Sequence, residues 1–222
     1  MSDKKVRTSE LFDCNTPFLT ELFNECEYPW QIVAYIKDYI LKIIDRGIEG
    51  YELLNGNILV GKNVKISPNA EINGPAIIGS NTEIRIGAFI RGNVIIGENC
   101  VVGNSCEVKN SILLNNVQIP HYNYVGDSVL GNKSHLGAGS VCSNLKNDNK
   151  PVVVHGDEDH STGMRKLGAI LADNVNVGCG CVLNPGTVIG KNTAVYPMVS
   201  VRGVIPADKI VKSTECISEK RG

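Results

Sequence analysis

Aliphatic residues recur every six positions along most of this chain. Ten successive hexads carry one without a miss, and the same spacing returns in two later stretches. The positions are Val60, Ile66, Ile72, Ile78, Ile84, Ile90, Ile96, Val102, Val108 and Leu114, then Leu130 and Leu136, then Leu171, Val177, Leu183, Ile189, Val195 and Val201. A period of six fits neither an α-helix nor an alternating strand, and it is typical of hexapeptide β-helices.

The residues around each aliphatic position fit the same interpretation. A small or β-branched residue follows four positions later, as at Ala70, Ala76 and Cys100, and Gly or Asn often comes directly after the aliphatic residue. Three hexads, about 18 residues, would close one triangular coil. Gly or Asn would tolerate the left-handed backbone of its corners. The sequence therefore predicts a mainly β fold, a left-handed parallel β-helix, with the handedness taken from the repeat class.

Residues 1–53 lack the hexads and have helical spacing instead. Thr16 and Pro17 predict the start of a short helix, and a longer one is expected over Pro29–Arg46. The apolar stripe of the longer helix is expected to cover an open end of the solenoid or an interface. We therefore expect a short N-terminal helical cap at 1–53 and a β-helix domain at 54–222.

The hexad spacing fails near Asn115–Tyr124 and stops altogether between Cys142 and Gly168. The second stretch, 142–168, is polar and rich in turn residues, apart from three consecutive valines that are compatible with a short strand. An insertion of this length in a compact solenoid is usually functional or disordered. We expect the chemistry to lie at these two interruptions.

Composition narrows the function classes. The net charge is −1 and the pI is about 6.4, so no basic field indicates nucleic acid. The sequence has no apolar run that would span a bilayer and no signal-peptide pattern at its start. The eight cysteines form no CxxC pair, and Cys100 and Cys106 fall at interior hexad positions. A reducing cytoplasm is therefore the expected compartment.

Two cations and a histidine are the candidate functional residues. Arg91 and Lys109 are one coil apart, so they should stack at one corner and suit an anion such as phosphate, although a solvated surface pair is the more common explanation of such charges. His121 stands at the first interruption, where Glu107 could orient its ring for proton transfer. A loop histidine bonded to a carbonyl is the alternative. The other three histidines share no metal-ligand spacing, which leaves a three-histidine zinc site as a weak alternative.

At these residues the sequence resembles the acetyltransferase domain of the bifunctional N-acetylglucosamine-1-phosphate uridyltransferase/glucosamine-1-phosphate acetyltransferase family. The resemblance covers roughly residues 54–206. It rests on a set of residues in the family's order and spacing: Arg91, Glu107, Lys109, Pro120, His121, Tyr124, Gly137, Ala138, Gly139, Asn144 and Lys150. No Gly-rich nucleotide-binding segment precedes the hexads, so a stand-alone chain without the uridyltransferase domain is expected.

The resemblance implies a role for each matching residue. His121 would be the general base, supported by Glu107, and Asn144 would hold the reacting amine. Arg91 and Lys109 would bind the sugar phosphate, while Tyr124 and Lys150 would complete the substrate contacts. The residues expected to contact acetyl-CoA are Ala138, Gly139, Cys179, Pro197, Arg165 and Lys166, joined by Lys191 and Arg202 on grounds of charge and position. Family members are homotrimers with sites between subunits, so the insertion is expected to reach a neighbour.

The expected function is acetyl-CoA-dependent N-acetylation of an amino-sugar 1-phosphate in UDP-N-acetylglucosamine biosynthesis, with no metal required. Glucosamine 1-phosphate is the expected acceptor and galactosamine 1-phosphate its rival, because Leu145 and His135 depart from the family pattern. Two further alternatives stay open. One is a γ-type carbonic anhydrase on the same fold, and the other is a non-catalytic sugar-phosphate-binding or assembly module. The expected partners are small molecules and copies of the chain, without nucleic acid or membrane.

Overall fold

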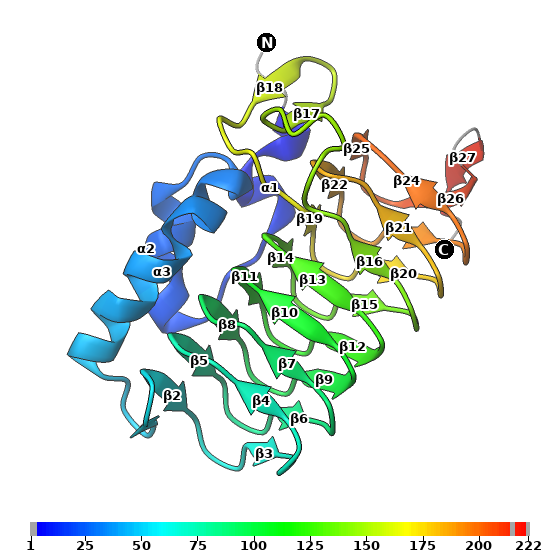
Figure 1. Ribbon diagram of the computed structural model, residues 1–222. Helices are drawn as coiled ribbons and strands as arrows, with labels where there is room; N and C mark the ends of the chain where they lie inside the picture. Colours follow the sequence, from blue (N-terminus) through cyan, green and yellow to red (C-terminus); the bar gives the residue numbers. More distant parts are fainter. Residues whose placement is uncertain (1–3, 214–215, 221–222) are drawn as a thin grey trace.

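The computed structural model describes residues 4–213 and 216–220, and its main body is a parallel β-helix (Figure 1). Short strands of successive coils stack into three long sheets, named A, B and C here, and the chain visits them in the repeating order A, B, C. Each coil therefore has an A/B, a B/C and a C/A corner. The predicted hexapeptide β-helix is confirmed.

Among the described residues, the three sheets hold nine, nine and seven strands. Sheet A contains β1 (Glu52–Leu54), β2 (Ile58–Val60), β5 (Ala76–Ile78), β8 (Val94–Ile96), β11 (Ser111–Leu113), β14 (Val129–Leu130), β19 (Ala169–Leu171), β22 (Thr187–Ile189) and β25 (Val204–Ile205). Sheet B contains β3 (Lys65–Ile66), β6 (Glu83–Ile84), β9 (Val101–Asn104), β12 (Gln118–His121), β15 (His135–Leu136), β20 (Asn176–Val177), β23 (Ala194–Val195), β26 (Lys209–Ser213) and β27 (Cys216–Glu219). Sheet C contains β4 (Glu71–Ile72), β7 (Phe89–Ile90), β10 (Glu107–Lys109), β13 (Tyr124–Gly126), β16 (Val141–Cys142), β21 (Val182–Leu183) and β24 (Ser200–Val201). Strands β1 and β27 pair antiparallel at sheet ends, and the other pairs within these sheets are parallel.

The aliphatic hexad residues fill the interior of the solenoid. Ile90 pairs with Val108 and Val108 with Val125 in successive coils, and all three side chains are fully buried. Ile66 in β3 keeps 37% of its surface exposed, because β3 is the edge strand of sheet B. Asparagines hold many corners with a left-handed backbone, for example Asn81 at φ 60°. Asn81 lies three residues after Ile78, whereas the sequence predicted this conformation directly after the aliphatic residue. Gly79, which follows Ile78, is not at positive φ, and a Cβ atom there would clash with Gly97 of the next coil.

The first interruption of the hexad spacing is a change of coil length, and the β-helix continues through it. Ile96 pairs with Leu113 and Val108 with Val125, so each of these coils has 17 residues instead of 18. Leu113 therefore takes the register position that the sequence assigned to Leu114, and Ile119 takes the next inward position. A corner shortened by one residue shifts the spacing without breaking the stack.

The N-terminal residues form η1 (Lys4–Val6), α1 (Thr8–Leu11), α2 (Pro17–Glu25) and α3 (Pro29–Arg46). Helix α3 packs against β8 and β11 on the outer face of sheet A, and it does not cover an open end as expected (Figure 1). The reason is a second apolar column on sheet A: Ile77, Ile95 and Ile112 pair in register, point away from the interior and are fully buried. A sheet that is apolar on both faces needs a layer on each.

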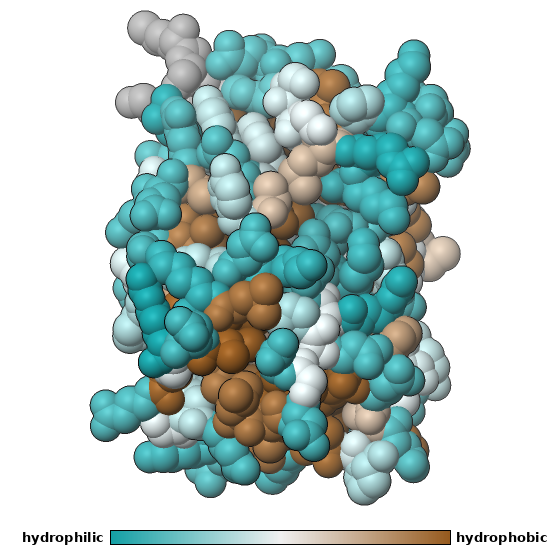
Figure 2. Space-filling model, turned by 60° about the vertical axis from the view of Figure 1, so that its left-hand side comes forward, coloured by the Kyte–Doolittle hydropathy of each residue, from teal (hydrophilic) through white to brown (hydrophobic). Residues whose placement is uncertain are grey.

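The helical layer forms much of one surface of the molecule. Figure 2 brings this side forward and shows hydrophilic atoms over most of it, with a hydrophobic area in the lower half. Within the described part of the chain, no helix is long and apolar enough to cross a membrane.

The insertion folds back onto its own chain. Strands β17 (Val153–His155) and β18 (Asp159–Ser161) form an antiparallel hairpin beside the N-terminal helices (Figure 1). Gly186 and Gly203, both with positive φ, let β17 lie directly on the C/A corner. A Cβ atom at Gly203 would come within 2.9 Å of the His155 carbonyl oxygen. The hairpin therefore rests on the later coils through glycine positions.

The packing predicts which thiols react. Burial raises the pKa of Cys100 and Cys142 to about 12 and that of Cys26 to about 11, whereas Cys179 and Cys216 are exposed. Because the thiolate is the attacking form, we expect a thiol reagent at about pH 8 to label Cys179 and Cys216 first. Mass spectrometry of labelled peptides measures this, with the unfolded protein as the control. Fast labelling of Cys142 in the native protein would contradict the register of sheet C.

Candidate active site on sheet C

Two cations lie one above the other where sheet C ends at the C/A corner. Ile90 and Val108 are register partners, so Arg91 and Lys109, which follow them, occupy the same place in successive coils. Adjacent strands in a sheet are about 4.8 Å apart, which brings both side chains within reach of one anionic group. The geometry agrees with the spacing of the sequence.

Arg91 is held by two neighbours on the outer face of sheet C. Its guanidinium donates to the Glu107 carboxylate at 2.6 Å and lies 5.9 Å from the centre of the Phe89 ring. The hydrogen bond to Glu107 raises the pKa of Arg91 above its ordinary value. Glu107 was expected to support His121, but the hydrogen bond described for its carboxylate goes to Arg91.

Asp127 organises the other cation. Its carboxylate is nearly buried and accepts from the Lys109 ammonium at 3.3 Å, from the Asn110 amide at 2.8 Å and from the Asn144 amide at 2.5 Å. Asp127 itself has φ 50°, a backbone conformation that Asp and Asn tolerate better than most residues. One carboxylate therefore joins the coil that carries Lys109 to the start of the insertion at Asn144.

Tyr124 lies between these groups. It pairs in register with Glu107, and its hydroxyl accepts a hydrogen bond from the Asn144 amide at 3.1 Å. Burial raises the pKa of Tyr124, and the nearby carboxylates of Asp127 and Glu107 raise it further. The phenol thus stays protonated at neutral pH, with its O–H free to donate to a ligand.

His121 lies at the opposite edge of sheet C, at the B/C corner. Its side chain is exposed, and its backbone N–H donates to the buried Asn123 side chain at 3.2 Å. Asn123 in turn donates to the Gly137 carbonyl at 2.8 Å, which ties the corner to the next coil. His121 therefore presents a free ring on a firmly held backbone.

Three residues expected to contact acetyl-CoA lie in the same column as His121. The amide of Gly139 donates to the His121 carbonyl, that of Gly180 to Ala138, and that of Met198 to Cys179. His121, Ala138, Cys179 and Pro197 thus occupy equivalent places in successive coils. The amide of Gly139 is used in this ladder, so it is not available to a developing oxyanion.

The remaining cationic residues are distributed over three places. Lys191 lies at the A/B corner, where its ammonium pairs with Asp13 at 2.8 Å, far from the B/C column. Arg202 lies at the C/A corner, in the register of Lys109. Lys166 pairs with Leu145 at the base of the insertion, and Arg165 beside it is exposed. Within one chain, Lys191 and Arg202 therefore do not share a groove with Cys179.

A cavity of about 380 Å³ lies between the insertion and the later coils. Its walls come from the insertion and its floor from sheet C, with Arg202, Asn184, Lys146, Asp148 and His155 among the lining residues. Lys150 is exposed in the same insertion, where its backbone N–H donates to Asp148. The cavity lies at the same C/A corner as Arg91 and Lys109, in the later coils toward the C-terminal end of the solenoid.

The four histidines lie in separate places. His135 bonds Asn176 at 3.0 Å, His155 pairs with Asp159 at 2.8 Å, and His160 packs against aromatic rings of the N-terminal segment. In the described part of the chain, no three His, Cys, Asp or Glu side chains are placed to hold one metal ion. One chain therefore does not assemble the three-histidine alternative.

Comparison with known proteins places this arrangement in a family. Residues 72–162 match the model of the GMPPB C-terminal domain. A bifunctional protein GlmU of Methanococcus vannielii is 33% identical over 222 residues, which cover 98% of this chain and 53% of that protein. A bifunctional sugar-1-phosphate nucleotidylyltransferase/acetyltransferase of Sulfurisphaera tokodaii is 39% identical over 88 residues, which cover 39% of this chain and 22% of that protein.

This chain carries a GlmU-like acetyltransferase domain. Nearly the whole chain matches the Methanococcus vannielii GlmU, but the chain spans only about half the length of that relative. A hexapeptide transferase family protein of Anaplasma phagocytophilum shares the fold, with a TM-score of 0.50 and 16% identity over 74% of this chain and 80% of that one.

Two residues that organise the GlmU-like site were missing from the sequence-based set. Asp127 is the acceptor for both Lys109 and Asn144, and Asn123 fixes the corner that carries His121. A signal for both was present, because each is an Asx residue next to the predicted corner in the run from Pro120 to Asp127. The partners of Asp127 lie 17 or 18 residues away, and Asn123 bonds Gly137 14 residues away, so the hexad spacing alone could not identify their roles.

Asp127→Asn tests the role of this carboxylate. Asn keeps the tolerance for positive φ but places N–H donors against the donors of Lys109 and Asn144, so we expect a loss of about 1–3 kcal/mol in the free energy of unfolding. Chemical denaturation measures the change. Asp148→Asn is the matched control, because Asp148 is exposed and pairs only with residues of its own loop, and no measurable change is expected there. Equal stability of both variants would contradict an organising role for Asp127.

Proposed function

We propose that this GlmU-like domain transfers the acetyl group of acetyl-CoA to the amine of an amino-sugar 1-phosphate, with glucosamine 1-phosphate as the acceptor. The observation that carries the proposal is the polar outer face of sheet C, where Asp127 and Asn144 join Lys109 to Tyr124 by hydrogen bonds and the Arg91–Glu107 pair lies beside them in register. The printed name of the Sulfurisphaera relative, which combines a sugar 1-phosphate with acetyl transfer, supports the same class.

Arg91 and Lys109 would bind the phosphate. Each cation is preorganised by a carboxylate, Glu107 or Asp127, so little side-chain entropy is lost when an anion binds. A phosphate dianion offers three strong acceptors and would share both cations with their carboxylate partners. The Tyr124 hydroxyl and the Asn144 amide would then contact the sugar ring.

His121 would act as the general base. It would take a proton from the sugar amine as the nitrogen attacks the thioester carbon, the C–S bond would break, and CoA would leave as the thiol. The exposed ring and the fixed backbone of His121 suit this role. With the Gly139 amide occupied, the Ala138 amide is the candidate donor to the developing oxyanion.

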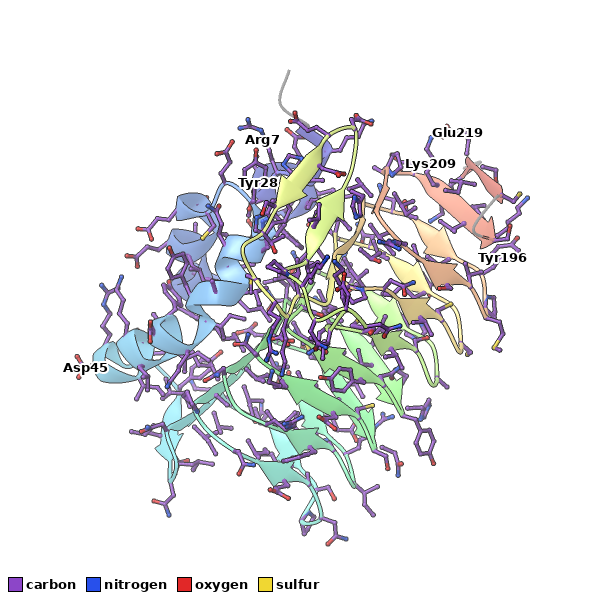
Figure 3. The ribbon with its side chains drawn as sticks, turned by 45° about the horizontal axis from the view of Figure 1, so that its top comes forward. Arg7, Tyr28, Asp45, Tyr196, Lys209 and Glu219 are labelled. Atoms are coloured by element: carbon purple, nitrogen blue, oxygen red, sulfur yellow. The ribbon has the colours of Figure 1, made fainter. Side chains whose placement is uncertain are left out.

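A homotrimer would unite the two halves of the site. In one chain, His121 and the Cys179 column lie at the B/C corner, whereas Asn144, Lys150 and Arg165 lie at the C/A corner or in the insertion. The B/C edge also carries exposed apolar residues, namely Ile86, Tyr122, Tyr196 and Met198, with exposed fractions from 48% to 80%. Tyr196 lies on the side away from the helices (Figure 3). An exposed apolar edge of this kind supports contact with another copy.

His121→Ala tests the general base. We expect acetyl transfer to fall about a hundredfold to ten-thousandfold, because the amine loses its proton acceptor while substrate binding stays intact. Thiol release from acetyl-CoA, measured across glucosamine 1-phosphate, galactosamine 1-phosphate and other amino-sugar phosphates, gives both the rate and the acceptor. His135→Ala is the control, because that ring bonds Asn176 in the next coil.

Three results would contradict parts of this proposal. A His121→Ala variant as fast as the unaltered chain would remove the base. Binding of sugar phosphate by the unaltered chain without thiol release would favour the non-catalytic binding module. Stoichiometric zinc in the purified protein, with loss of function on chelation, would revive the γ-type carbonic anhydrase alternative.

Replacing the phosphate-binding cations should change binding more than chemistry. For Arg91→Ala or Lys109→Ala we expect the KM for the sugar phosphate to rise about tenfold to a hundredfold, because a charge-assisted hydrogen bond is lost. The KM for acetyl-CoA should stay the same in steady-state assays. Arg85→Ala is the matched control, because Arg85 forms an exposed ion pair with Glu83 on sheet B. An unchanged KM in both site variants would exclude this phosphate position.

A further inference from the structure

The tip of the insertion is attached to the N-terminal helices by three rings. Tyr28 and Trp30, at the start of α3, stack in parallel with their centres 4.8 Å apart and 7° between their planes. His160 of β18 lies 5.3 Å from the Tyr28 ring and 5.6 Å from the Trp30 ring. Trp30 is only 5% exposed, so the stack is a packed contact. We call these three residues the aromatic clamp.

The clamp is fixed on its helix side. Tyr28 is the N-cap of α3, where its backbone N–H donates to the Gln31 side chain at 2.8 Å. Lys5, also in the N-terminal segment, pairs with Asp157 at the hairpin tip at 2.7 Å. Figure 3 shows Tyr28 close to the hairpin, on the side of the molecule opposite Tyr196. The helices thus hold the hairpin at a place far from the B/C edge.

The hairpin is held on its other side by the solenoid. Val154 pairs with His160 across the hairpin and is fully buried, and the backbone of β17 lies on Gly186 and Gly203. A cavity of about 440 Å³ beside Trp30, His160 and Met164 leaves the contact with α3 partly unfilled. Besides the Lys5–Asp157 ion pair, the clamp supplies the ring contacts of this attachment.

The chain on either side of the hairpin carries residues of the proposed site. Lys146 and Asp148 line the cavity above Arg202, and Lys150 follows them. On the return, Arg165 and Lys166 lead back to the base of the insertion. Asn144, by contrast, is fixed by Asp127 and Tyr124 without help from the hairpin. Movement of the hairpin would therefore displace Lys146 and Lys150 and leave Asn144 and Lys166 in place at the base.

We propose that Tyr28, Trp30 and His160 are positioning residues that hold the insertion over the later coils and thereby set the affinity for the acetyl donor. The clamp touches no reacting atom. It acts through the hairpin residues Val153 and His155 and through the segment 146–148, which line the cavity together with Arg202. The part that concerns the acetyl donor rests on the proposed function, whereas the attachment of the hairpin does not.

One variant and its rescue test this proposal. Trp30 is the only tryptophan in the chain, so its fluorescence reports on the clamp directly. His160→Ala removes one ring of the clamp, and His160→Phe restores a ring of similar width. Leu41→Ala, a partly exposed position on the same helix, is the control. Each variant is measured by tryptophan emission, by the rate of protease cleavage within the insertion, by thermal unfolding, and by KM and kcat for acetyl-CoA.

In His160→Ala we expect Trp30 emission to shift to longer wavelength and the insertion to be cut faster. The KM for acetyl-CoA should rise about tenfold with kcat nearly unchanged, because an aromatic contact of ordinary strength is lost. His160→Phe should restore all three readouts, and Leu41→Ala should alter none. A purely structural role would lower the thermal midpoint without this split between KM and kcat.

The outcomes separate the two proposals. Unchanged emission and cleavage in His160→Ala would overturn the clamp, whatever the activity. A changed cleavage rate with unchanged KM would show that the hairpin is held by the rings but does not act on the donor, which overturns the positioning role. If the unaltered chain has no acetyl transfer, the proposed function fails, and emission and cleavage still decide whether the clamp holds the hairpin.

Discussion

The backbone ladder between successive coils is the constraint on which the rest of the structure depends. Each short strand hydrogen-bonds to the coil above and the coil below, so a residue can neither shift along the axis nor rotate to another face without breaking both ladders. Side chains that share a register position therefore form straight columns. The Arg91–Lys109 pair and the column from His121 to Pro197 are both consequences of this rule, and neither needs a special local motif.

The same rule explains how much of the fold could be predicted. The hexad spacing was sufficient for the β-helix, because an inward aliphatic residue is required on every face of every coil. It was not sufficient for coil length, since a corner can lose a residue while the inward position moves from Leu114 to Leu113. The position of the helices could also have been predicted from the sequence. Ile77 and Ile95 form a second apolar column on sheet A, and only a layer outside the solenoid could cover it. The hexad period marks only the inward-facing column, and the outward-facing column of sheet A lies next to it in the sequence.

The placement of the candidate residues could be predicted where it depends on register and could not where it depends on long-range contacts. The pairing of Arg91 with Lys109 follows from 18-residue spacing in the early coils. The bond from Glu107 to Arg91, and the three bonds to Asp127, depend on side-chain directions at a corner that no periodicity encodes. Lys191 has the most distant partner of these residues, because Asp13 is 178 residues away, in the segment between α1 and α2. Local sequence offers no sign of such a contact.

The architecture divides the proposed site into a rigid half and an adjustable half. His121, Arg91 and Lys109 belong to coils that are paired on both sides, so their separation changes only if the solenoid itself deforms. The insertion is held by a bridge at its base, by its contact with two glycines, by the Lys5–Asp157 ion pair and by ring contacts with the start of a helix. Acid–base chemistry tolerates little displacement, whereas a long flexible donor can be held by a segment that closes over it. Each chain would thus carry the proposed base on its rigid coils and the extra cations on its insertion. Because the helical layer covers sheet A, it leaves the opposite B/C edge clear for a second copy, and it holds the insertion from the other side.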